Sequence, residues 1–338
     1  MTMGGIRAAV AGLAGQWVVV CGASKGIGRA LVLALAASGA NVVAVARSAP
    51  ALADVAAEAR RVAPGPPPLA SIVTVVADLA DEDAVARLMA VELPPIVGPA
   101  GVRMLILNHV AGWWQHWLAG PDGSHVARLA AAQGAGVDGV RVTPTLRALF
   151  AVNFDSYVAI ATHAMGLLLA AGDAGSRAQL VVVSSVAGKI GLPKVPPYAA
   201  AKHALHGFFE SLRHELDMTG APLGITMAML GNIDTAANRT NTAGEVAHLP
   251  YASPHDAAAA IIAAAASGTE SVTFPWAQIQ PVIWLDMLIP RLARTIIQRA
   301  TYGPGSFVPS PTSIALPSPD VMLGADRPKP DHPQTVLT

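Results

Sequence analysis

Short apolar runs alternate along the chain with longer runs rich in alanine and leucine. The short runs have few polar positions on either face, which is typical of strands covered on both sides, whereas the long runs have the composition and length of helices. The alternation therefore predicts an α/β domain with a doubly wound parallel sheet. The expected strands are 17–21, 41–46, 71–77, 104–107, 180–184, 224–229 and 271–274.

Helices are expected between these strands, and local signals mark some of their ends. Acidic residues occupy the first turn of a helix at 81–92, where the helix dipole favours them, and a proline cluster at 64–68 ends a helix at 51–62. The stretch 113–145 has no strong periodicity and is interpreted as an insertion or loop. The remaining helices are expected at 29–38, 145–171, 198–218 and 256–266.

The two ends of the chain differ from the domain between them. Residues 1–14 lack a compact apolar region and are expected to form a short leader with no clear signal peptide, and the Pro-, Gly- and Ser-rich residues 303–338 a disordered tail. Charged residues interrupt the apolar run 281–297, which predicts a helix lying on a surface or packing in a dimer, within a helical extension 281–302. No run has the roughly 18 apolar residues of a transmembrane helix, so we expect a cytoplasmic or peripherally membrane-associated protein.

Composition narrows the functional classes. Basic and acidic residues number 22 each and charged residues make up 13% of the chain, so no electropositive surface for nucleic acid is predicted. The single cysteine, Cys21, excludes an intrachain disulfide and fits a reducing compartment. Hydrophobic residues make up 53% of the chain, which fits a large buried core. No metal site is predicted.

A glycine-rich segment, Gly22-Ala-Ser-Lys-Gly26-Ile-Gly28, lies between the first expected strand and the first expected helix. Glycines there let the backbone turn tightly and approach a pyrophosphate, to which the helix N-terminus presents unpaired N–H groups. Alone, the run is also compatible with an ordinary strand-to-helix turn. Its position after the first strand favours a dinucleotide site, formed by Gly22, Ser24, Lys25, Gly26, Ile27 and Gly28.

The end of the second expected strand indicates which dinucleotide binds. An NAD-selective site places an acidic residue there for the ribose 2′-hydroxyl, whereas this chain has Arg47-Ser48. Arg47 and Lys25 would neutralise a 2′-phosphate, so the sequence favours NADP(H). The alternative is that Arg47 is a solvated surface residue.

The most informative pattern is Tyr198-Ala-Ala-Ala-Lys202, preceded by Ser185. Tyrosine and lysine at i and i+4 share one helix face, so the ammonium can stabilise the phenolate and lower its pKa, which makes Tyr198 a general acid or base. Ser185, at a strand end, could donate a hydrogen bond to a substrate oxygen. Alone, the Tyr–Lys pair would also fit a surface helix, but together with the glycine loop and the serine it indicates a catalytic set.

Roughly residues 15–300, which contain these motifs, resemble the short-chain dehydrogenase/reductase family. Cys21 to Gly28 is similar to its Thr-Gly-x-x-x-Gly-x-Gly loop, and Asn108 to the start of its Asn-Ala-Gly motif. Tyr198 and Lys202 match its active-site pair, with Ser185 at the family's distance. The resemblance implies a single NADP-binding domain of Rossmann type over 15–302, and a homodimer.

Within that family, the segments 22–29, 104–109, 181–189 and 230–235 look most like 11β-hydroxysteroid dehydrogenase type 1 and hydroxysteroid dehydrogenase-like proteins. Leu230-Gly231 is diagnostic, because most of the wider family has Pro-Gly there. The resemblance implies that Asn153 holds a water in a proton relay to Lys202, and that 285–302 serves dimer packing or membrane contact. Further implied cofactor contacts are Ser48, Asp78, Leu79, Asn108, His109, Val110, Tyr198, Lys202, Ile233 and Thr235, and implied substrate contacts are Ser185, Tyr198, Leu230 and Gly231.

Some positions depart from the family pattern. Cys21 replaces the usual threonine, which removes a hydroxyl hydrogen bond from the glycine loop. His109 occupies the second position of the Asn-Ala-Gly motif and is interpreted as structural rather than catalytic. The lid-like stretch 236–254 and the insertion 113–145 are specific to this chain.

The sequence thus predicts an NADP(H)-dependent oxidoreductase that interconverts a secondary alcohol and a ketone on a bulky, lipophilic, steroid- or sterol-like substrate. Tyr198 is the expected general acid or base, assisted by Ser185, Lys202 and Asn153. Two alternatives remain open: a broad carbonyl reductase, and a non-catalytic NADP(H)-binding sensor or scaffold on the same fold.

Overall fold

The computed structural model describes residues 10–64, 70–114, 142–173, 176–242 and 249–302. Its centre is a seven-stranded sheet in the order β3-β2-β1-β4-β5-β6-β7, with every neighbouring pair parallel. This confirms the doubly wound α/β class. The strands are β1 (Trp17–Cys21), β2 (Asn41–Ala46), β3 (Ile72–Val76), β4 (Met104–Leu107), β5 (Ala178–Ser185), β6 (Leu223–Leu230) and β7 (Ser271–Phe274).

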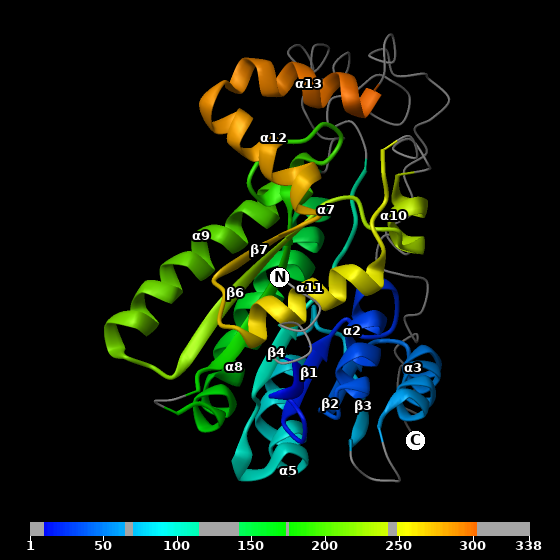
Figure 1. Cartoon of the computed structure of the whole chain (residues 1–338), viewed down its shortest axis with the longest axis vertical. Helices are drawn as coiled ribbons and strands as arrows, with labels where there is room; N and C mark the ends of the chain where they lie inside the picture. The colour runs from blue at the N-terminus through cyan, green and yellow to red at the C-terminus, as the bar shows by residue number, and fades with distance from the viewer. Residues whose placement is uncertain (1–9, 65–69, 115–141, 174–175, 243–248, 303–338) are drawn as a thin grey trace, which may run out of the picture.

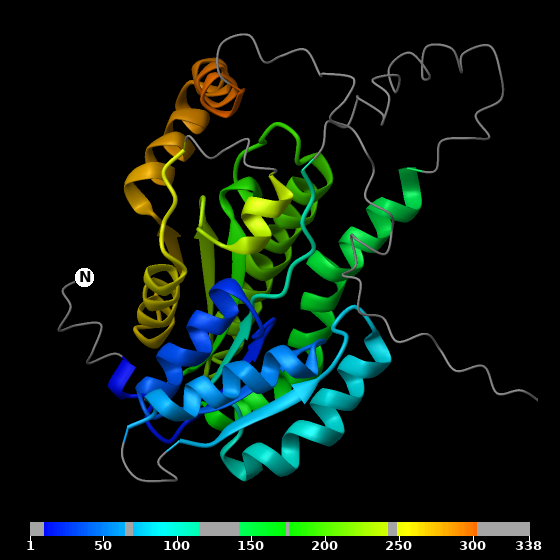
Figure 2. The same cartoon turned by 90° about the vertical axis from the view of Figure 1, so that its right-hand side faces the viewer.

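Successive side chains of the central strands enter two separate hydrophobic cores. Val18 and Val20 of β1 belong to one core, while Val19 and Cys21 belong to the other. This is the period of two that a strand imposes, and it requires apolar residues at every position because both faces are covered. Helices α2 (Gly26–Ala37), α3 (Ala49–Val62) and α11 (Pro254–Ala266) cover the first face, and α4 (Glu82–Arg87), α8 (Ser156–Ala171) and α9 (Pro196–Thr219) the second (Figures 1 and 2).

The expected helix at 145–171 is interrupted. The structure has α7 (Val142–Phe150), then a five-residue π-helix (Ala151–Asp155), then α8. The π turn contains Asn153, whose side chain is fully buried and bonded to the segment after β4. A π turn shifts the helix register by one residue, a change that apolar periodicity does not reveal.

The expected helix at 81–92 is also divided. Asp81 caps it by accepting from the backbone N–H groups of Asp83 and Ala84, as the acidic first turn suggested. A π-helix (Leu88–Glu92) then leads into a short helix, α5 (Leu93–Val97), and a 3₁₀ turn (Gly98–Ala100).

The C-terminal extension is two helices, not one. Helix α12 (Trp276–Leu288) and helix α13 (Pro290–Tyr302) meet at Ile289, which has φ −138° and ψ 69°. Proline disfavours helical geometry in the residue before it, so Pro290 ends α12 and starts α13. Both helices lie beyond one end of the sheet (Figure 1). The lid-like stretch begins with a short helix, α10 (Ala236–Asn241).

The expected leader and tail fall almost wholly on residues outside the described ranges, and so does most of the stretch 113–145. Among the described residues, one helical stretch, Leu146–Ala171, is long and apolar enough to cross a membrane by length and composition. Tyr157, Ile160 and Leu168 of that stretch are buried in the second core, which is typical of a core helix.

Candidate active site

A cavity of about 580 Å³ opens where the carboxyl ends of the central strands meet. Ligand sites of open α/β sheets lie at this edge, and the volume suits a small molecule. It is walled by the ends of β5 and β6, the start of α9, α10, and parts of α12 and α13. Of the residues singled out from the sequence, Ile27, Asn108, Val110, Ser185, Tyr198, Lys202, Leu230, Gly231, Ile233 and Thr235 line it.

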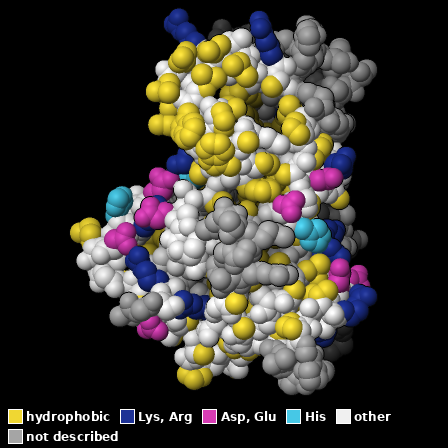
Figure 3. Space-filling model, viewed as in Figure 1, with side chains coloured by type: hydrophobic (Ala, Val, Ile, Leu, Met, Phe, Trp, Pro, Cys, Tyr) yellow, Lys and Arg dark blue, Asp and Glu magenta, His cyan; other side chains and the backbone are white. Residues whose placement is uncertain are grey.

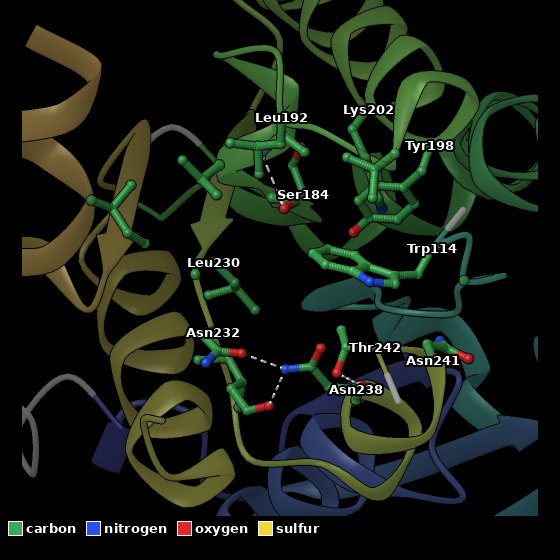
Figure 4. A pocket seen from close by; sticks show the side chains of 18 of the residues that line it. Trp114, Ser184, Leu192, Tyr198, Lys202, Leu230, Asn232, Asn238, Asn241 and Thr242 are labelled. Carbon is green, nitrogen blue, oxygen red and sulfur yellow. Dashed lines mark hydrogen bonds between the residues drawn. The ribbon is translucent and has the colours of Figure 1, made fainter. Parts of the chain in front are cut away.

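Ser185, Tyr198 and Lys202 meet at one wall of the cavity. Ser185 is the last residue of β5, and its Oγ accepts from the backbone N–H of Ala187, which fixes the hydroxyl at the start of a 3₁₀ turn. Tyr198 lies in the first turn of α9, and Lys202 lies one turn later on the same face, with its Nζ 5.9 Å from the centre of the Tyr198 ring (Figure 4). The i, i+4 spacing thus brings the two groups together as expected.

The Tyr198 phenol has two opposing influences on its acidity. Burial raises its pKa above the usual value, because the phenolate loses solvation, and the hydrogen bond to Ser185 lowers it. The phenol is therefore protonated near neutral pH in the chain by itself. That is the form needed to donate a proton to a substrate oxygen.

Lys202 is an unusual buried cation. It is 2% exposed, and its Nζ donates to the backbone carbonyl of Val183 at 3.0 Å. Desolvation lowers the pKa of its ammonium to about 7. A buried lysine with so perturbed a pKa beside a tyrosine at a cavity wall is typical of a functional site.

Asn153 lies behind this wall, fully buried in the π-helix. Its Oδ1 accepts from Ala111 N at 2.8 Å, and its Nδ2 donates to Ala111 O at 2.9 Å. Both polar atoms of its side chain are thus used by the segment after β4, so the side chain does not face the cavity.

The glycine loop forms a cradle that only glycine fits. A Cβ on Gly28 would lie 1.9 Å from the carbonyl oxygen of Gly22, and Gly22 itself has φ +77°. Asn108 Nδ2 donates to that same Gly22 carbonyl at 3.2 Å. Helix α2 starts at Gly26, and the side chain of its N-cap residue, Lys25, makes no hydrogen bond to the first N–H groups. Close backbone approach and an uncapped helix N-terminus together fit a dinucleotide pyrophosphate.

The residues expected around the adenosine lie at the same edge, outside the cavity. Arg47 and Ser48 follow β2, and Asp78 and Leu79 follow β3, the neighbouring strand. Arg47 is exposed, Ser48 accepts from Ala51 N as the cap of α3, and Asp78 accepts from Ala80 N. Ser24 and Lys25 are in the loop before α2, and the Lys25 side chain is exposed. The topology therefore places all these residues on one path from the glycine loop.

His109 does not line the cavity. It is 9% exposed, and burial, with the nearby charges of Lys202 and Arg47, lowers the pKa of its imidazole to about 3. A histidine that stays neutral throughout the working pH range cannot be the acid or base of the reaction, which agrees with its interpretation as structural.

The opposite walls contain residues that sequence reasoning did not single out. Figure 4 shows Trp114 between Tyr198 and the side chains of Asn238 and Thr242. Asn238 belongs to the expected lid, and its Nδ2 donates to Asn232 Oδ1 at 2.6 Å. Three asparagines close together in sequence, Asn232, Asn238 and Asn241, were a signal that could have been used. The apolar part of the lining comes from Ile190, Leu192, Val195, Ile279, Val282 and Ile297.

The geometry agrees with comparisons to known proteins. The family model described as short chain dehydrogenase matches residues 16–109 and 130–246. The chain belongs to the short-chain dehydrogenase family. This oxidoreductase family accounts for the sheet, for the glycine loop after β1, and for the position of the cavity.

Within this family, the chain is similar to proteins named for hydroxysteroid dehydrogenases. Hydroxysteroid 11-beta-dehydrogenase 1-like proteins are 32% identical in Xenopus tropicalis, over 85% of this chain and 88% of the relative, and 35% identical in Gallus gallus, over 82% and 84%. This confirms the resemblance drawn from the motifs.

Solved structures show the same fold. The Pseudomonas aeruginosa RhlG/NADP active-site complex has a TM-score of 0.62 at 22% identity, covering 78% of this chain and 95% of that one. A short-chain dehydrogenase/reductase from Burkholderia phymatum in complex with NAD has a TM-score of 0.65 at 20% identity, covering 83% and 95%. These neighbours hold one nicotinamide dinucleotide or the other, so they leave the choice of cofactor to the residues of this chain.

Proposed function

We propose that the protein is an NADP(H)-dependent alcohol dehydrogenase or carbonyl reductase acting on a bulky lipophilic substrate. The observation that supports it most directly is the meeting of Ser185, Tyr198 and buried Lys202 at one wall of a largely apolar cavity that adjoins the glycine loop. An acid, its activator and a hydrogen-bond donor beside a dinucleotide cradle suit hydride transfer coupled to proton transfer.

The nicotinamide, when bound, supplies or accepts the hydride. The glycine loop and the uncapped start of α2 would hold the pyrophosphate, Ile233 and Thr235 the nicotinamide end, and Lys25, Arg47 and Ser48 the 2′-phosphate. Asp78 and Leu79 would flank the adenine. The residues in this assignment follow β1, β2, β3 and β6 at the carboxyl edge of the sheet.

The protein groups then handle the proton. In the reductive direction, Ser185 Oγ–H donates a hydrogen bond to the substrate oxygen, and Tyr198 Oη gives it a proton as the negative charge develops. The Lys202 ammonium stabilises the phenolate that remains, and a water held at the π turn of Asn153 returns the proton. In the oxidative direction, the Tyr198 phenolate takes the proton from the alcohol.

The size and polarity of the cavity argue for a lipophilic substrate. Ile190, Met229, Ile279, Ile283 and Ile297 form a hydrophobic cluster, of which Ile190, Ile279 and Ile297 line the cavity. A steroid- or sterol-like ketone or alcohol would bury its rings there, and each buried CH₂ contributes about 0.8 kcal/mol. The relatives are named as hydroxysteroid dehydrogenase-like proteins, and we therefore propose a steroid-like compound as the first candidate substrate.

The decisive experiment is NADPH consumption by the purified chain with a panel of oxosteroids, simple ketones and quinones. Turnover confined to bulky alicyclic ketones supports the proposal. Equal turnover on small ketones and quinones would indicate a broad carbonyl reductase. Tight NADPH binding with no turnover on any compound would contradict an enzyme and favour a sensor or scaffold.

Arg47 should decide the cofactor. The Arg47→Glu variant removes a charge-assisted hydrogen bond to a 2′-phosphate and adds repulsion, so kcat/KM for NADPH should fall about ten- to one-hundred-fold. The value for NADH should stay level or rise. Arg61→Glu, an equal charge change at the exposed end of α3, is the control. If both variants keep the wild-type ratio of NADPH to NADH, Arg47 does not read the phosphate.

The C-terminal helices offer a further part of this proposal: docking on a lipid surface. Figure 3 shows hydrophobic side chains gathered over α12 and α13, and Trp284, Met287, Leu288, Ile289 and Leu292 are among the exposed ones. Exposed apolar side chains next to basic residues suit an anionic membrane surface, and Arg291, Arg294 and Arg299 supply the charge. Val282 and Ile297 of the same helices line the cavity, so a lipophilic substrate could enter from the bilayer.

Sedimentation with vesicles of phosphatidylcholine and phosphatidylserine tests this docking. Met287 is 76% exposed, and Met287→Glu should weaken vesicle binding about tenfold or more, because it replaces an inserted apolar side chain with a charge. Met218→Glu, at an 87% exposed methionine in the last turn of α9, should bind as wild type. If the Met287→Glu variant binds vesicles as wild type does, but a dimer of the chain dissociates in this variant, the surface packs against a second copy of the chain instead.

A further inference from the structure

A buried cluster of His109, Ser156 and Tyr157 lies next to Lys202, outside the chemistry proposed above. Tyr157 is fully buried, and Ser156 and His109 are 4% and 9% exposed. Ser156 and Tyr157 begin α8, directly after the π-helix of Asn153, and His109 is the second residue after β4. The cluster thus joins the two segments that lie behind the catalytic wall.

Hydrogen bonds make this cluster a fixed, neutral unit. Tyr157 Oη donates to the backbone carbonyl of His109 at 2.6 Å, and the two rings lie 4.4 Å apart, tilted by 35°. His109 Nε2 is 2.7 Å from Ser156 Oγ, whose own proton goes to Val152 O at 2.8 Å. Ser156 therefore accepts from His109, so the imidazole proton is on Nε2.

The face of Tyr157 meets the catalytic lysine. Lys202 Nζ lies 5.0 Å from the centre of the Tyr157 ring, closer than the 5.9 Å that separates it from the Tyr198 ring. A desolvated ammonium over an aromatic face is attracted by the ring quadrupole. Together with the bond to Val183 O, this ring contact favours the charged form of Lys202.

The same cluster also holds the segment between the catalytic wall and the glycine loop. Tyr157 and Ser156 hold His109, and Asn153 makes two bonds to Ala111. On the other side, a Cβ on Gly22 would lie 2.7 Å from the Cα of His109. A shift of His109 would therefore displace both the glycine loop and the π turn.

From these contacts we infer that Tyr157 and His109 are positioning residues: the Tyr157 ring holds the Lys202 ammonium, charged, beside Tyr198, and His109 holds that ring in place. The inference rests on the proposed function, because it assigns the lysine a role in the same reaction. The titratable and charged groups that face this region are Tyr198 and Lys202 of α9, Tyr157 of α8, His109 after β4, Cys21 of β1 and Arg47 after β2.

A double-mutant cycle measures the contact without cofactor or substrate. Tyr157→Phe and Tyr157→Leu both remove the hydroxyl, but only the first keeps the ring. The Phe-to-Leu change should lower the folding equilibrium constant about five- to thirty-fold more with Lys202 present than in the Lys202→Met background. Equal losses in both backgrounds would overturn the inference.

A matched pair controls for general loss of packing. Phe209→Leu removes a fully buried ring of the same hydrophobic core, two helical turns beyond Lys202. It should destabilise the fold equally in the wild-type and Lys202→Met backgrounds. For His109, Gln can still donate to Ser156 and Ala cannot, so His109→Gln should keep the Tyr157–Lys202 coupling that His109→Ala weakens.

Kinetics gives a second, independent readout. A less charged ammonium stabilises the Tyr198 phenolate less, so the acid limb of kcat for alcohol oxidation should move to higher pH in Tyr157→Leu, by about half a unit or more, relative to Tyr157→Phe. A variant that only folds poorly would lose activity equally at every pH, and an unmoved limb would overturn the inference. Turnover retained by a Tyr198→Phe chain would instead refute the proposed function and leave the coupling energy standing.

Discussion

Replacing Tyr198 with phenylalanine should lower kcat for carbonyl reduction by about 10²- to 10⁴-fold, the range that a positioned general acid contributes. The ring stays in place, so the walls of the cavity keep their shape and the dissociation constant of NADPH should change by less than about threefold. What is lost is the Oη–H that points to the cavity beside Ser185. Steady-state kinetics and NADPH fluorescence titration measure the two quantities separately.

A second Tyr-to-Phe change provides the control. The Tyr251 hydroxyl is buried and, unlike that of Tyr198, has no hydrogen-bond partner among the described residues. Tyr251 does not line the cavity, and Arg239 lies 4.7 Å above its ring. Tyr251→Phe should keep wild-type kcat. If Tyr198→Phe also kept it, the whole catalytic assignment would be wrong.

Replacing Lys202 with methionine should change activity and stability in opposite directions. Turnover should fall about 10²-fold or more, because the phenolate loses its cation. The free energy of unfolding should rise by about 1–4 kcal/mol near neutral pH, since a buried charge is replaced by an apolar side chain of similar length. Opposite effects on stability and activity are expected where a buried, desolvated charge is retained because the reaction needs it.

The pH dependence of this stabilisation has a definite sign. The pKa of Lys202 is about 7 in the folded chain and near its usual value when unfolded, so between these values the unfolded state binds more protons. The cost of burying the lysine is therefore complete below about pH 7 and fades as pH rises toward 10. Accordingly, the advantage of Lys202→Met in thermal melts should shrink between about pH 6.5 and 9.5.

The control for that measurement is a surface lysine. Lys189 lies 2.7 Å from Glu210 in a partly exposed ion pair, and Lys189→Met should lower stability by less than about 1 kcal/mol, with no comparable trend up to pH 9.5. A Lys202→Met chain that unfolds more readily than wild type at neutral pH would show that the buried ammonium is well compensated.

Much of the fold was readable from local patterns. A continuous apolar run such as Val18–Cys21 indicates a strand with both faces buried. Such a strand needs helices on both sides of a parallel sheet. Asp81 and the prolines at 64–68 marked helix ends, because caps and ring constraints act within a few residues. The Tyr198–Lys202 motif was equally local, since the two residues need only one helical turn to meet.

One error occurred where distant residues interact. The π turn at Asn153 breaks the expected helix 145–171, and its side chain pairs with Ala111, 42 positions away. The residue types of this π turn, Ala151–Asp155, are compatible with an ordinary α-helix, so the sequence alone did not reveal the turn. The partition of the C-terminal extension at Ile289 was, in contrast, a missed local signal, because Pro290 alone disfavours helical geometry in the preceding residue.

By itself, the sequence determined the sheet, the glycine loop that tolerates no side chain, the family, and the pairing of Tyr198 with Lys202. These features depend on periodicity and short spacing, which the chain carries in its local order. Only the tertiary structure decided that Lys202 is buried beside a ring from α8, that burial keeps the His109 imidazole neutral, and which apolar side chains enclose the cavity. Burial and ring contacts between separate elements depend on how those elements pack. Local sequence patterns do not show which side chains from distant elements come into contact.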